Sequence, residues 1–447
     1  MGCKRGVKRQ RQRGTLDTYM ARTPEARPKP MKADEEKAAL FFKYLHRRML
    51  VNVQMHGTST VLGKHATPPP HDNILDLVTS GNAYRHLDKA DQEEGAAFRE
   101  LVGMVEGARP SDEQFERLLM LCLLRMGMFN EVRMMEWASQ HRKQPVSALH
   151  ALPCTEEEAL AFASWLKKNE QRLRACKDGG NKMWAGAGNQ VQGFRWVGAL
   201  RSWFGKPPGN QSPLRAVASK VRAARTWEEA NLAVQKLDRV GPYTGAQGLC
   251  TLLFGVCGGD FSLVFDNEGF DTGSLLDWCA YGPGPKTSIE KIFGAKADTL
   301  EGIRQLRRMA DDQFKQLGIE FPYLLNADAT PRPLTCVDLE HSLCYFCRYL
   351  RARQHLGANA RKLHELVFPA ICDGRVRRWK ISQLADKSFE GAWNEALDKM
   401  KLAGCAPLGV EHKVEPAKKG KKKEKKKRAE KIKDEPMSQR PAKRTRR

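Results

Sequence analysis

Residues 237–253 have the sequence LDRVGPYTGAQGLCTLL. Leu237, Val240 and Gly241 follow an amphipathic stretch, and a second stretch rich in leucine and small residues comes directly after Pro242. Proline is well tolerated at the first position of a helix, because its missing N–H would have no partner there. The spacing therefore predicts two helices joined by a tight glycine turn, which is the layout of a helix-hairpin-helix.

The start of the second helix in such a hairpin is suited to binding phosphate. Its first backbone N–H groups have no partner within the helix, the helix dipole is positive there, and Gly241 allows the ligand to come close. Because the chain is basic, we expect this hairpin to contact DNA. The residues expected to do so are Gly241, Tyr243, Thr244 and Gln247. The alternative is an ordinary helix–helix turn that binds no ligand.

Helical patterns continue on both sides of the hairpin. Ser111 and Thr155 precede acidic first turns, as N-cap residues do. Alternating strand patterns are scarce, and the segment 280–287, AYGPGPKT, has the composition of a loop. The sequence therefore predicts an all-α, multi-helical fold. The segments with helical spacing are 35–51, 111–129, 155–173, 212–224, 226–240, 299–318 and 337–356.

The positive charge lies mainly at the two ends of the chain. The 447 residues carry a net charge of +24, of which residues 1–32 contribute +8 and residues 411–447 contribute +11. Segments of such high net charge do not bury a core, so we expect both ends to be disordered. Lysine and arginine runs of this kind are typical of nuclear localisation and of nucleic-acid contact, although a purely solubilising tail is the alternative.

The distribution of charge and the helical pattern together predict that the chain has four parts. Residues 1–33 form a basic disordered N-terminal segment, and residues 34–360 form a helical domain for DNA binding and base modification. Residues 361–410 form a C-terminal helical extension, and residues 411–447 form a disordered basic tail that directs the chain to the nucleus.

Other function classes find little support in the sequence. No stretch has the roughly 20 apolar residues that a membrane span requires, and no secretory signal opens the chain. The 12 cysteines are scattered, which favours reduced thiols. Cys344 and Cys347 have zinc-ligand spacing near His341 and Cys336, but they lie in an apolar helical pattern, so core cysteines are the preferred interpretation. The glycine-rich segments do not fit a nucleotide-binding P-loop.

A short motif near the N-terminus indicates a further partner. The stretch RQRGTLDTYM, residues 11–20, resembles a sliding-clamp interaction box, with Leu16, Tyr19 and Met20 at suitable spacing. We therefore expect a clamp to be among the partners.

The hairpin resembles that of the helix-hairpin-helix DNA glycosylases, in which a catalytic aspartate follows the second helix. Asp266 in VFDNEG is the candidate for that aspartate in this chain. Tyr243 stands where the lysine of bifunctional members is expected, so the resemblance implies a monofunctional enzyme and not a Schiff-base lyase.

A second resemblance extends over residues 34–360. Five motifs occur in the order found in the helical domain of 5-hydroxymethyluracil (5-hmdU) DNA kinases and in the related alpha-glutamyl/putrescinyl thymine pyrophosphorylases, a family that resembles the glycosylases in its helical core. These motifs lie within residues 73–92, 118–132, 237–253, 277–294 and 337–353. The matching residues are Asn82, Arg85 and Asp88, Arg125, Phe129 and Asn130, Asp277 and Trp278, Gly282, Pro283 and Gly284 in a loop, and Glu340 and Cys344.

The resemblance implies roles for these residues in thymine hypermodification. Arg85 and Arg125 are candidates to clamp phosphate, while Asp277 and Glu340 are candidates for a base or a metal ligand. Asn82 and Asn130 are expected at the DNA, and Asn82 and Arg85 share a helix face if their segment is helical. The alternative for each charged residue is a structural ion pair.

Three functions remain open at this point. The first is phosphoryl or pyrophosphoryl transfer to a modified thymine base in DNA, for which the resemblance implies ATP and Mg²⁺, or a separate kinase or transferase chain because no P-loop is present. The second is a monofunctional glycosylase that uses Asp266. The third is a non-catalytic reader of modified DNA.

Overall fold

The computed structural model confirms the all-α prediction. It describes residues 31–56, 72–79, 82–128, 131–141, 147–169, 192–205, 211–266, 269–326 and 329–405. Helices are present in all seven segments where the periodicity predicts them, and the named strands in the described part are only two residues long each. None of the described helices is long and apolar enough to cross a membrane.

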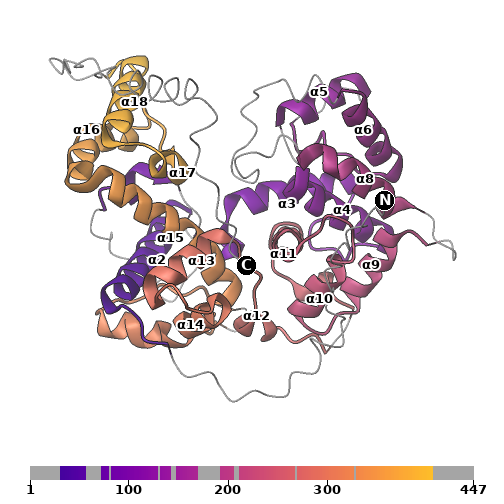
Figure 1. The fold of residues 1–447 in the computed structure, drawn as a ribbon, viewed down its shortest axis with the longest axis horizontal. Helices are drawn as coiled ribbons and strands as arrows, with labels where there is room; N and C mark the ends of the chain where they lie inside the picture. Colours follow the sequence, from indigo (N-terminus) through magenta and orange to yellow (C-terminus); the bar gives the residue numbers. More distant parts are fainter. Residues whose placement is uncertain are drawn as a thin grey trace, which may run out of the picture.

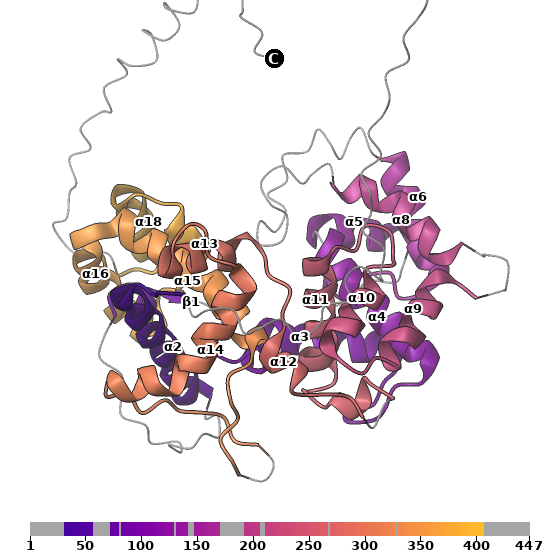
Figure 2. The ribbon, with the colours of Figure 1, turned by 60° about the horizontal axis from the view of Figure 1, so that its bottom comes forward.

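The helices form two lobes, which lie side by side in Figure 1 and Figure 2. The first, here called the terminal lobe, combines α2 near the N-terminus with the C-terminal helices from α13 onward. Its elements are α2 (Glu35–His56), η1 (Leu75–Leu77), β1 (Val78–Thr79), α13 (Pro283–Phe293), α14 (Thr299–Gln316), α15 (Cys336–Leu356), η6 (Gly357–Asn359), α16 (Ala360–Cys372), β2 (Trp379–Lys380), α17 (Ile381–Ala385) and α18 (Phe389–Leu402).

The second, here called the central lobe, comes from the middle of the chain. Its elements are η2 (Arg85–Leu87), α3 (Lys89–Val102), α4 (Asp112–Met128), α5 (Glu131–His141), α6 (Glu156–Lys168), α8 (Gln192–Phe204), α9 (Pro213–Arg222), α10 (Trp227–Val234), α11 (Pro242–Cys250), η4 (Thr251–Val256) and η5 (Phe261–Leu263). The short helix α12 (Ser274–Asp277) lies between the two lobes in Figure 2. The central lobe is therefore an insertion into the terminal lobe.

Side-chain caps begin the helices where the sequence predicts them. The Ser111 hydroxyl accepts a hydrogen bond from the Gln114 N–H before α4, and the Thr155 hydroxyl accepts one from the Glu158 N–H before α6. Before α15, Thr335 and Asp338 form a reciprocal capping box. These caps fix the start of each helix, and with it the direction in which the later side chains point.

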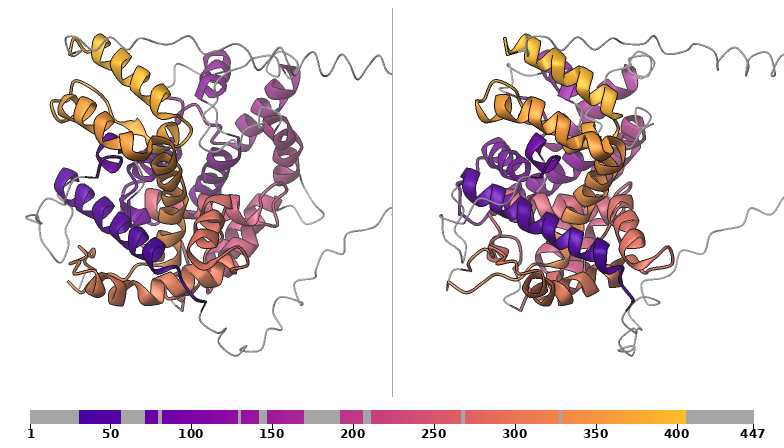
Figure 3. Two further views of the ribbon diagram at one scale, coloured as in Figure 1. Left: turned by 60° about the vertical axis from the view of Figure 1, so that its left-hand side comes forward. Right: turned by 90° about the vertical axis from the view of Figure 1, so that its left-hand side faces the viewer.

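The terminal lobe is held together by aromatic packing across α2. Figure 3 shows α2 crossing the lobe beside α14 and α15. The ring of Phe41 lies 5.2 Å from that of Phe346 on α15, and the ring of Phe42 lies 5.3 Å from that of Phe314 on α14, both edge to face. This packing orients α15, which supplies five of the residues that line the candidate site.

The central lobe contains a very close crossing of α3 and η4. A Cβ atom added at Gly95 would lie 1.9 Å from the Gly255 carbonyl oxygen, and one added at Gly255 would lie 2.3 Å from the Asp91 carbonyl oxygen. Only glycine permits this approach, which brings α3 against η4, a six-residue π-helix that continues α11. The crossing therefore determines where Asp91 lies relative to α11.

The predicted glycine turn is present between α10 and α11. Gly241 is the N-cap of α11 and Pro242 is its first residue, as expected. The turn contains Arg239 with a positive φ of 68°, a conformation that costs a non-glycine residue about 1 kcal/mol or more. The buried Asn231 side chain on α10 donates to the Pro242 carbonyl at 3.0 Å and so ties the two helices together.

Candidate functional site

A small cavity lies where α11 and η2 of the central lobe meet α15 of the terminal lobe. Its volume is about 40 Å³. Every side chain of its wall carries a nitrogen, oxygen or sulfur atom. The lining residues are Arg85, Tyr243, Gln247, Glu340, His341, Cys344, Tyr345 and Arg348.

Arg85 is the centre of the polar network and is almost completely buried. Its Nε donates to Asp91 at 2.5 Å, and its Nη1 donates to the Gln247 side-chain oxygen at 2.9 Å. Its backbone N–H donates to the Asp338 carboxylate at 2.7 Å. Arg85 therefore joins η2, α3, α11 and α15, and its charge is already balanced by Asp91, so it holds the other groups in position.

Glu340 differs from the other buried acids because one of its oxygens has no partner. The Gln247 side-chain N–H donates to its Oε2 at 3.4 Å, while Oε1 has no hydrogen-bond partner within the described part of the chain. The residue is only 2% exposed. Burial raises the pKa of Glu340 to about 7, and the charge of Arg85 only partly opposes this effect. The nearby Gly282 N–H also lowers the pKa, although it does not form a hydrogen bond of normal geometry with Oε1.

His341 contacts both Arg85 and Asp88. Arginine N–H groups can only donate, so the His341 Nδ1, 2.8 Å from the Arg85 Nη1, accepts a hydrogen bond from it. The His341 Nε2 lies 3.1 Å from the Asp88 carboxylate. His341 thus joins Asp91 and Gln247 in orienting Arg85.

A second buried acid–arginine pair lies next to this network. Arg125 on α4 contacts Glu94 on α3 at 2.5 Å, and both side chains are buried. Burial raises the pKa of Glu94 to about 7, although Arg125 acts in the opposite direction. Neither residue lines the cavity. The structure therefore brings Arg125 close to the network but gives it an ion-pair partner of its own.

The expectation of a loop at residues 280–287 is partly wrong. Gly282 is the N-cap of α13, and Pro283 and Gly284 lie in its first turn. Backbone N–H groups in the first turn have no partner within the helix, so a proline, which lacks the N–H, costs no hydrogen bond there. A Cβ added at Gly282 would lie 3.1 Å from the Tyr243 ring, and one added at Gly284 would lie 3.0 Å from the Cys344 sulfur. The start of α13 is therefore packed directly against the cavity wall.

Asp266 and Asp277 lie in ion pairs away from the cavity wall. Asp266 contacts Arg109 and lies 3.1 Å from Arg222, and its side chain is 50% exposed. Asp277 lies 3.3 Å from Arg307, and its side chain is 67% exposed. These contacts match the ion-pair alternative, and the catalytic roles of both residues stay predictions.

The asparagines and the turn residues have different positions. Asn82 precedes η2 and is not helical, so the condition for a shared helix face with Arg85 is not met. Its side chain donates to the Leu87 carbonyl and closes the turn. Gly241 and Thr244 lie at the start of α11, six and three residues before Gln247. Asn130, the clamp motif with Leu16, Tyr19 and Met20, and the basic tail 411–447 lie outside the described residues.

Sequence reasoning missed several residues of the network as site candidates. These are Asp91, Asp338, His341, Tyr345 and Arg348, which lie within the matching motifs but were not singled out there. A signal for Arg348 was nevertheless present, because it follows Glu340 and Cys344 at four-residue intervals in a helical pattern. Asp91 lies within the 73–92 motif.

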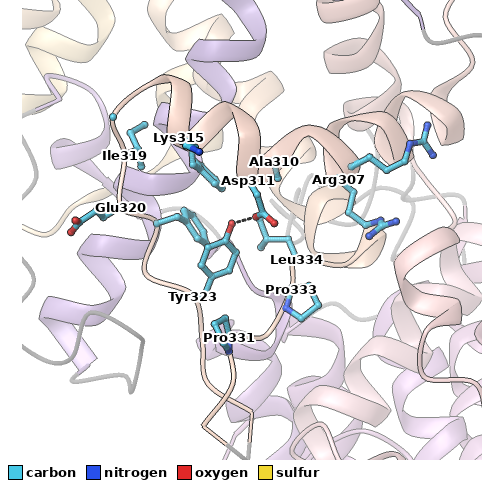
Figure 4. Close-up of a pocket in the computed structure, with 14 residues that line it drawn as sticks. Arg307, Ala310, Asp311, Lys315, Ile319, Glu320, Tyr323, Pro331, Pro333 and Leu334 are labelled. Carbon is cyan, nitrogen blue, oxygen red and sulfur yellow. Dashed lines mark hydrogen bonds between the residues drawn. The ribbon is translucent and has the colours of Figure 1, made fainter.

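A larger groove runs along α14 and has a volume of about 890 Å³ (Figure 4). Three of its five charged side chains have protein partners: the Tyr323 hydroxyl donates to Asp311, Arg307 pairs with Asp277, and Arg308 pairs with Glu301. No buried carboxyl oxygen without a partner faces this groove within the described residues. The smaller cavity, which has such an oxygen, is therefore the better candidate.

The residues around the cavity do not fit a magnesium–nucleotide site. Magnesium in such sites is held by carboxylate oxygens. Here Asp91 is engaged by Arg85, Asp338 by Arg85 and Thr335, and Asp88 lies against His341, which leaves a single oxygen of Glu340. The described ranges contain no group of three His, Cys, Asp or Glu residues that could hold a metal ion.

The cysteine pair on α15 has contacts of the kind that core cysteines make. Cys347 is buried and accepts a hydrogen bond from Arg351 at 3.6 Å, and Cys336 donates to the Leu276 carbonyl at 2.8 Å. Burial raises the pKa of Cys344 to about 11, so it remains a thiol at neutral pH.

Comparison with known proteins identifies the stretch that contains most of this site. Residues 214–358 match the family model described as "5-hmdU DNA kinase, helical domain". The matched stretch runs from α9 to the residues just after α15 and includes Tyr243, Gln247 and Glu340. The resemblance seen in the sequence is thus confirmed for this part of the chain. Neither the curated proteins nor the solved structures contain a match.

Proposed function

We propose that this protein binds DNA and recognises a thymine derivative with a hydroxyl group on its 5-substituent, such as 5-hydroxymethyluracil. The match to the helical domain of 5-hmdU DNA kinases supports a related role in the metabolism of modified thymine. The cavity between α11 and α15 supplies the chemistry that such recognition needs.

The free oxygen of Glu340 is the observation that carries the proposal. A buried oxygen without a hydrogen-bond donor costs about 1–3 kcal/mol, and more when it is charged. The hydroxyl group of a 5-hydroxymethyl substituent is a donor of the right kind. Binding it would satisfy Oε1 while Gln247 holds Oε2.

The size of the cavity favours a substituent over a whole base. A volume of about 40 Å³ accommodates about three water molecules. One carbon and one oxygen fit this space, whereas a pyrimidine ring does not. The ring would therefore lie at the mouth, next to Tyr243 and Tyr345, whose pKa values are raised by burial so that both hydroxyls stay neutral.

Discrimination against ordinary thymine follows from the same geometry. A site built to hydrogen-bond a ligand hydroxyl rejects the analogue that lacks it, because its own buried polar group is then left unpaired. Thymine would place a methyl group against Glu340. We therefore expect at least tenfold preference for 5-hydroxymethyluracil.

The hairpin supports DNA as the carrier of this base. The first turn of α11, with Gly241 and Thr244, is about one helical turn from Gln247 in the cavity wall. A backbone phosphate at this helix start would be favoured by the dipole and the unpaired N–H groups. A nuclear location and a sliding-clamp partner are proposed from the sequence alone.

Glu340 also has the basicity that phosphoryl transfer requires. A carboxyl group with a pKa of about 7 is suited to take the proton of a hydroxyl nucleophile at neutral pH. Since the described residues do not fit a magnesium–nucleotide site, we propose that a separate kinase or transferase chain supplies the phosphoryl donor. The glycosylase alternative depends on Asp266, which has two arginine partners elsewhere.

The test compares the full-length protein with Glu340→Gln on two duplexes that differ in one base, 5-hydroxymethyluracil or thymine. Fluorescence anisotropy measures binding, and mass spectrometry of digested nucleosides after incubation with and without ATP and Mg²⁺ measures modification. We expect the wild type to prefer the modified duplex and Glu340→Gln to lose most of that preference.

Glu94→Gln is the matched control, because Glu94 is an equally buried acid with a similar pKa that does not line the cavity. The Glu94→Gln variant should retain the preference for the duplex with 5-hydroxymethyluracil. Equal binding of both duplexes by the wild type would refute the proposed recognition, and abasic sites formed without ATP would establish a glycosylase instead.

A further inference from the structure

The cavity wall contains a buried acid, Glu340, and a half-buried cation, Arg348. Glu340, Cys344 and Arg348 follow one another at four-residue intervals on α15, so they share one face of the helix. All three line the cavity. Glu340 is buried, while Cys344 and Arg348 are half-buried, so the row leads from the interior toward solvent over about 12 Å of helix.

Arg348 is the cation of this cavity that has no acidic partner. Within the described ranges it has neither an ion pair nor a hydrogen bond, and its guanidinium group lies 5.2 Å from the centre of the Tyr345 ring. Such a cation–π contact orients the guanidinium group without neutralising its charge. Arg85, the other arginine of the cavity, is fully engaged by Asp91, Gln247 and His341.

We propose that Arg348 binds a phosphate group of the ligand at the mouth of the cavity. The guanidinium group is planar and matches two phosphate oxygens at once. Cys344, one turn before Arg348 on α15, remains a neutral thiol and therefore does not neutralise the charge of Arg348. The ligand class is thus a nucleotide, with its substituted base toward Glu340 and its phosphate toward solvent.

The identity of the base rests on the proposed function, but the phosphate contact does not. Two sources of phosphate fit this chemistry: the DNA backbone next to the recognised base, and the phosphate of a free nucleotide. Binding measurements on each of the two ligands separate these sources.

The experiment uses the full-length protein and its variants Arg348→Gln and Arg348→Lys. Arg351→Gln is the control: Arg351 is an exposed arginine on the same helix that contacts the Cys347 sulfur and does not line the cavity. One arm measures the affinity for 5-hydroxymethyl-2′-deoxyuridine and its 5′-monophosphate by calorimetry. The other measures affinity for the two duplexes against salt concentration.

If Arg348 binds the phosphate of a free nucleotide, the wild type will bind the monophosphate about 10–100 times more tightly than the nucleoside. Arg348→Gln will abolish that difference, Arg348→Lys will keep part of it, and Arg351→Gln will keep all of it. If the phosphate is in the DNA backbone, Arg348→Gln will instead reduce the slope of log K against log salt by about 1.

A wild type that does not distinguish the monophosphate from the nucleoside, together with an unchanged salt slope in Arg348→Gln, would overturn the inference. Loss of affinity in Arg348→Gln for both duplexes equally, with no preference for the modified base in the wild type, would support the phosphate contact and refute only the proposed base recognition.

Discussion

At Glu340, burial and the charge of Arg85 act in opposite directions on the same carboxyl group. Burial has the larger effect, and the pKa rises from its ordinary value of 4.5 to about 7. The folded state therefore binds the proton more tightly than the unfolded state does. The stability that this proton provides is fully present below about pH 4.5 and is lost as the pH rises to about 7.

Glu340→Gln should remove most of this pH dependence. A shift of this size corresponds to a loss on the order of 3 kcal/mol in the free energy of unfolding between pH 4.5 and 7.5. Urea denaturation at these two pH values measures it. Glu94 contributes in the same direction, so the stability of the double variant Glu94→Gln/Glu340→Gln should depend still less on pH. An unchanged loss of stability in Glu340→Gln would show that Glu340 titrates normally.

The roles of single residues could be predicted from the sequence only in part. Arg85, Tyr243, Gln247 and Glu340 were all expected to contribute to a site, and the structure places them around one cavity. The sequence could not indicate which acids lie in ion pairs. Asp266 finds its partner Arg222 44 residues away, and that contact depends on packing that no local pattern contains.

At the level of helices and turns, the close crossing of α3 and η4 is the contact on which the site depends most. Gly255→Ala would place a Cβ atom 2.3 Å from the Asp91 carbonyl, which is backbone and cannot move alone. We expect a loss of at least about 3 kcal/mol in the free energy of unfolding, because the two helices must separate. Separation would also move Asp91 away from Arg85.

Gly198→Ala in α8 is the matched control for this substitution. Gly198 lies in a helix and a Cβ added there would meet nothing within 4 Å. It should stabilise the protein by up to about 1 kcal/mol, because alanine favours the helix more than glycine does. Thermal unfolding of the two variants makes the comparison, and a Gly255→Ala variant as stable as the wild type would contradict the geometry of the crossing.

The helices were predictable because each buries one face, so that apolar residues recur every three to four positions in the sequence. The start of α13 was not predictable in this way. Glycine and proline in 280–287 favour a loop when their positions relative to the helix start are unknown. The meeting of η2, α11 and α15 was also not predictable. Arg85 and Gln247 are 162 residues apart, and Gln247 and Glu340 are 93 apart.

For the whole molecule, the structure makes residues 361–405 part of the terminal lobe. β2 pairs in parallel with β1, with Val78 opposite Trp379. His364 on α16 lies 3.1 Å from the buried Asp76, and the Arg378 side chain donates to the Asp76 carbonyl at 3.0 Å. The C-terminal extension thus completes the packing around residues 72–79.

A chain that ends at residue 360 should therefore fail to fold its terminal lobe. The truncation removes fully buried side chains that each contribute about 1.5–3 kcal/mol, and their sum is comparable to the whole stability of a typical domain. These are Leu363, Val367, Trp379, Ile381 and Leu384. Circular dichroism during heating measures the effect, and a cooperative transition at the wild-type temperature would show that the extension is independent.

The basic tail and the cavity should make separable contributions to DNA binding. The tail, residues 411–447, carries seventeen lysine and arginine residues, and contacts of this kind release counterions without reading the sequence of the DNA. The cavity, by contrast, contacts one base through a buried carboxyl group. Removal of residues 411–447 should therefore weaken binding to every duplex at low salt and make log K less dependent on log salt.

The preference for 5-hydroxymethyluracil over thymine should survive this truncation, because Glu340 and Gln247 are unaffected by it. Anisotropy titrations of both duplexes at several salt concentrations measure the two quantities at once. A truncated protein with full affinity and an unchanged salt slope would show that the tail does not contact DNA. Loss of the base preference would show that recognition depends on the tail and not on the cavity alone.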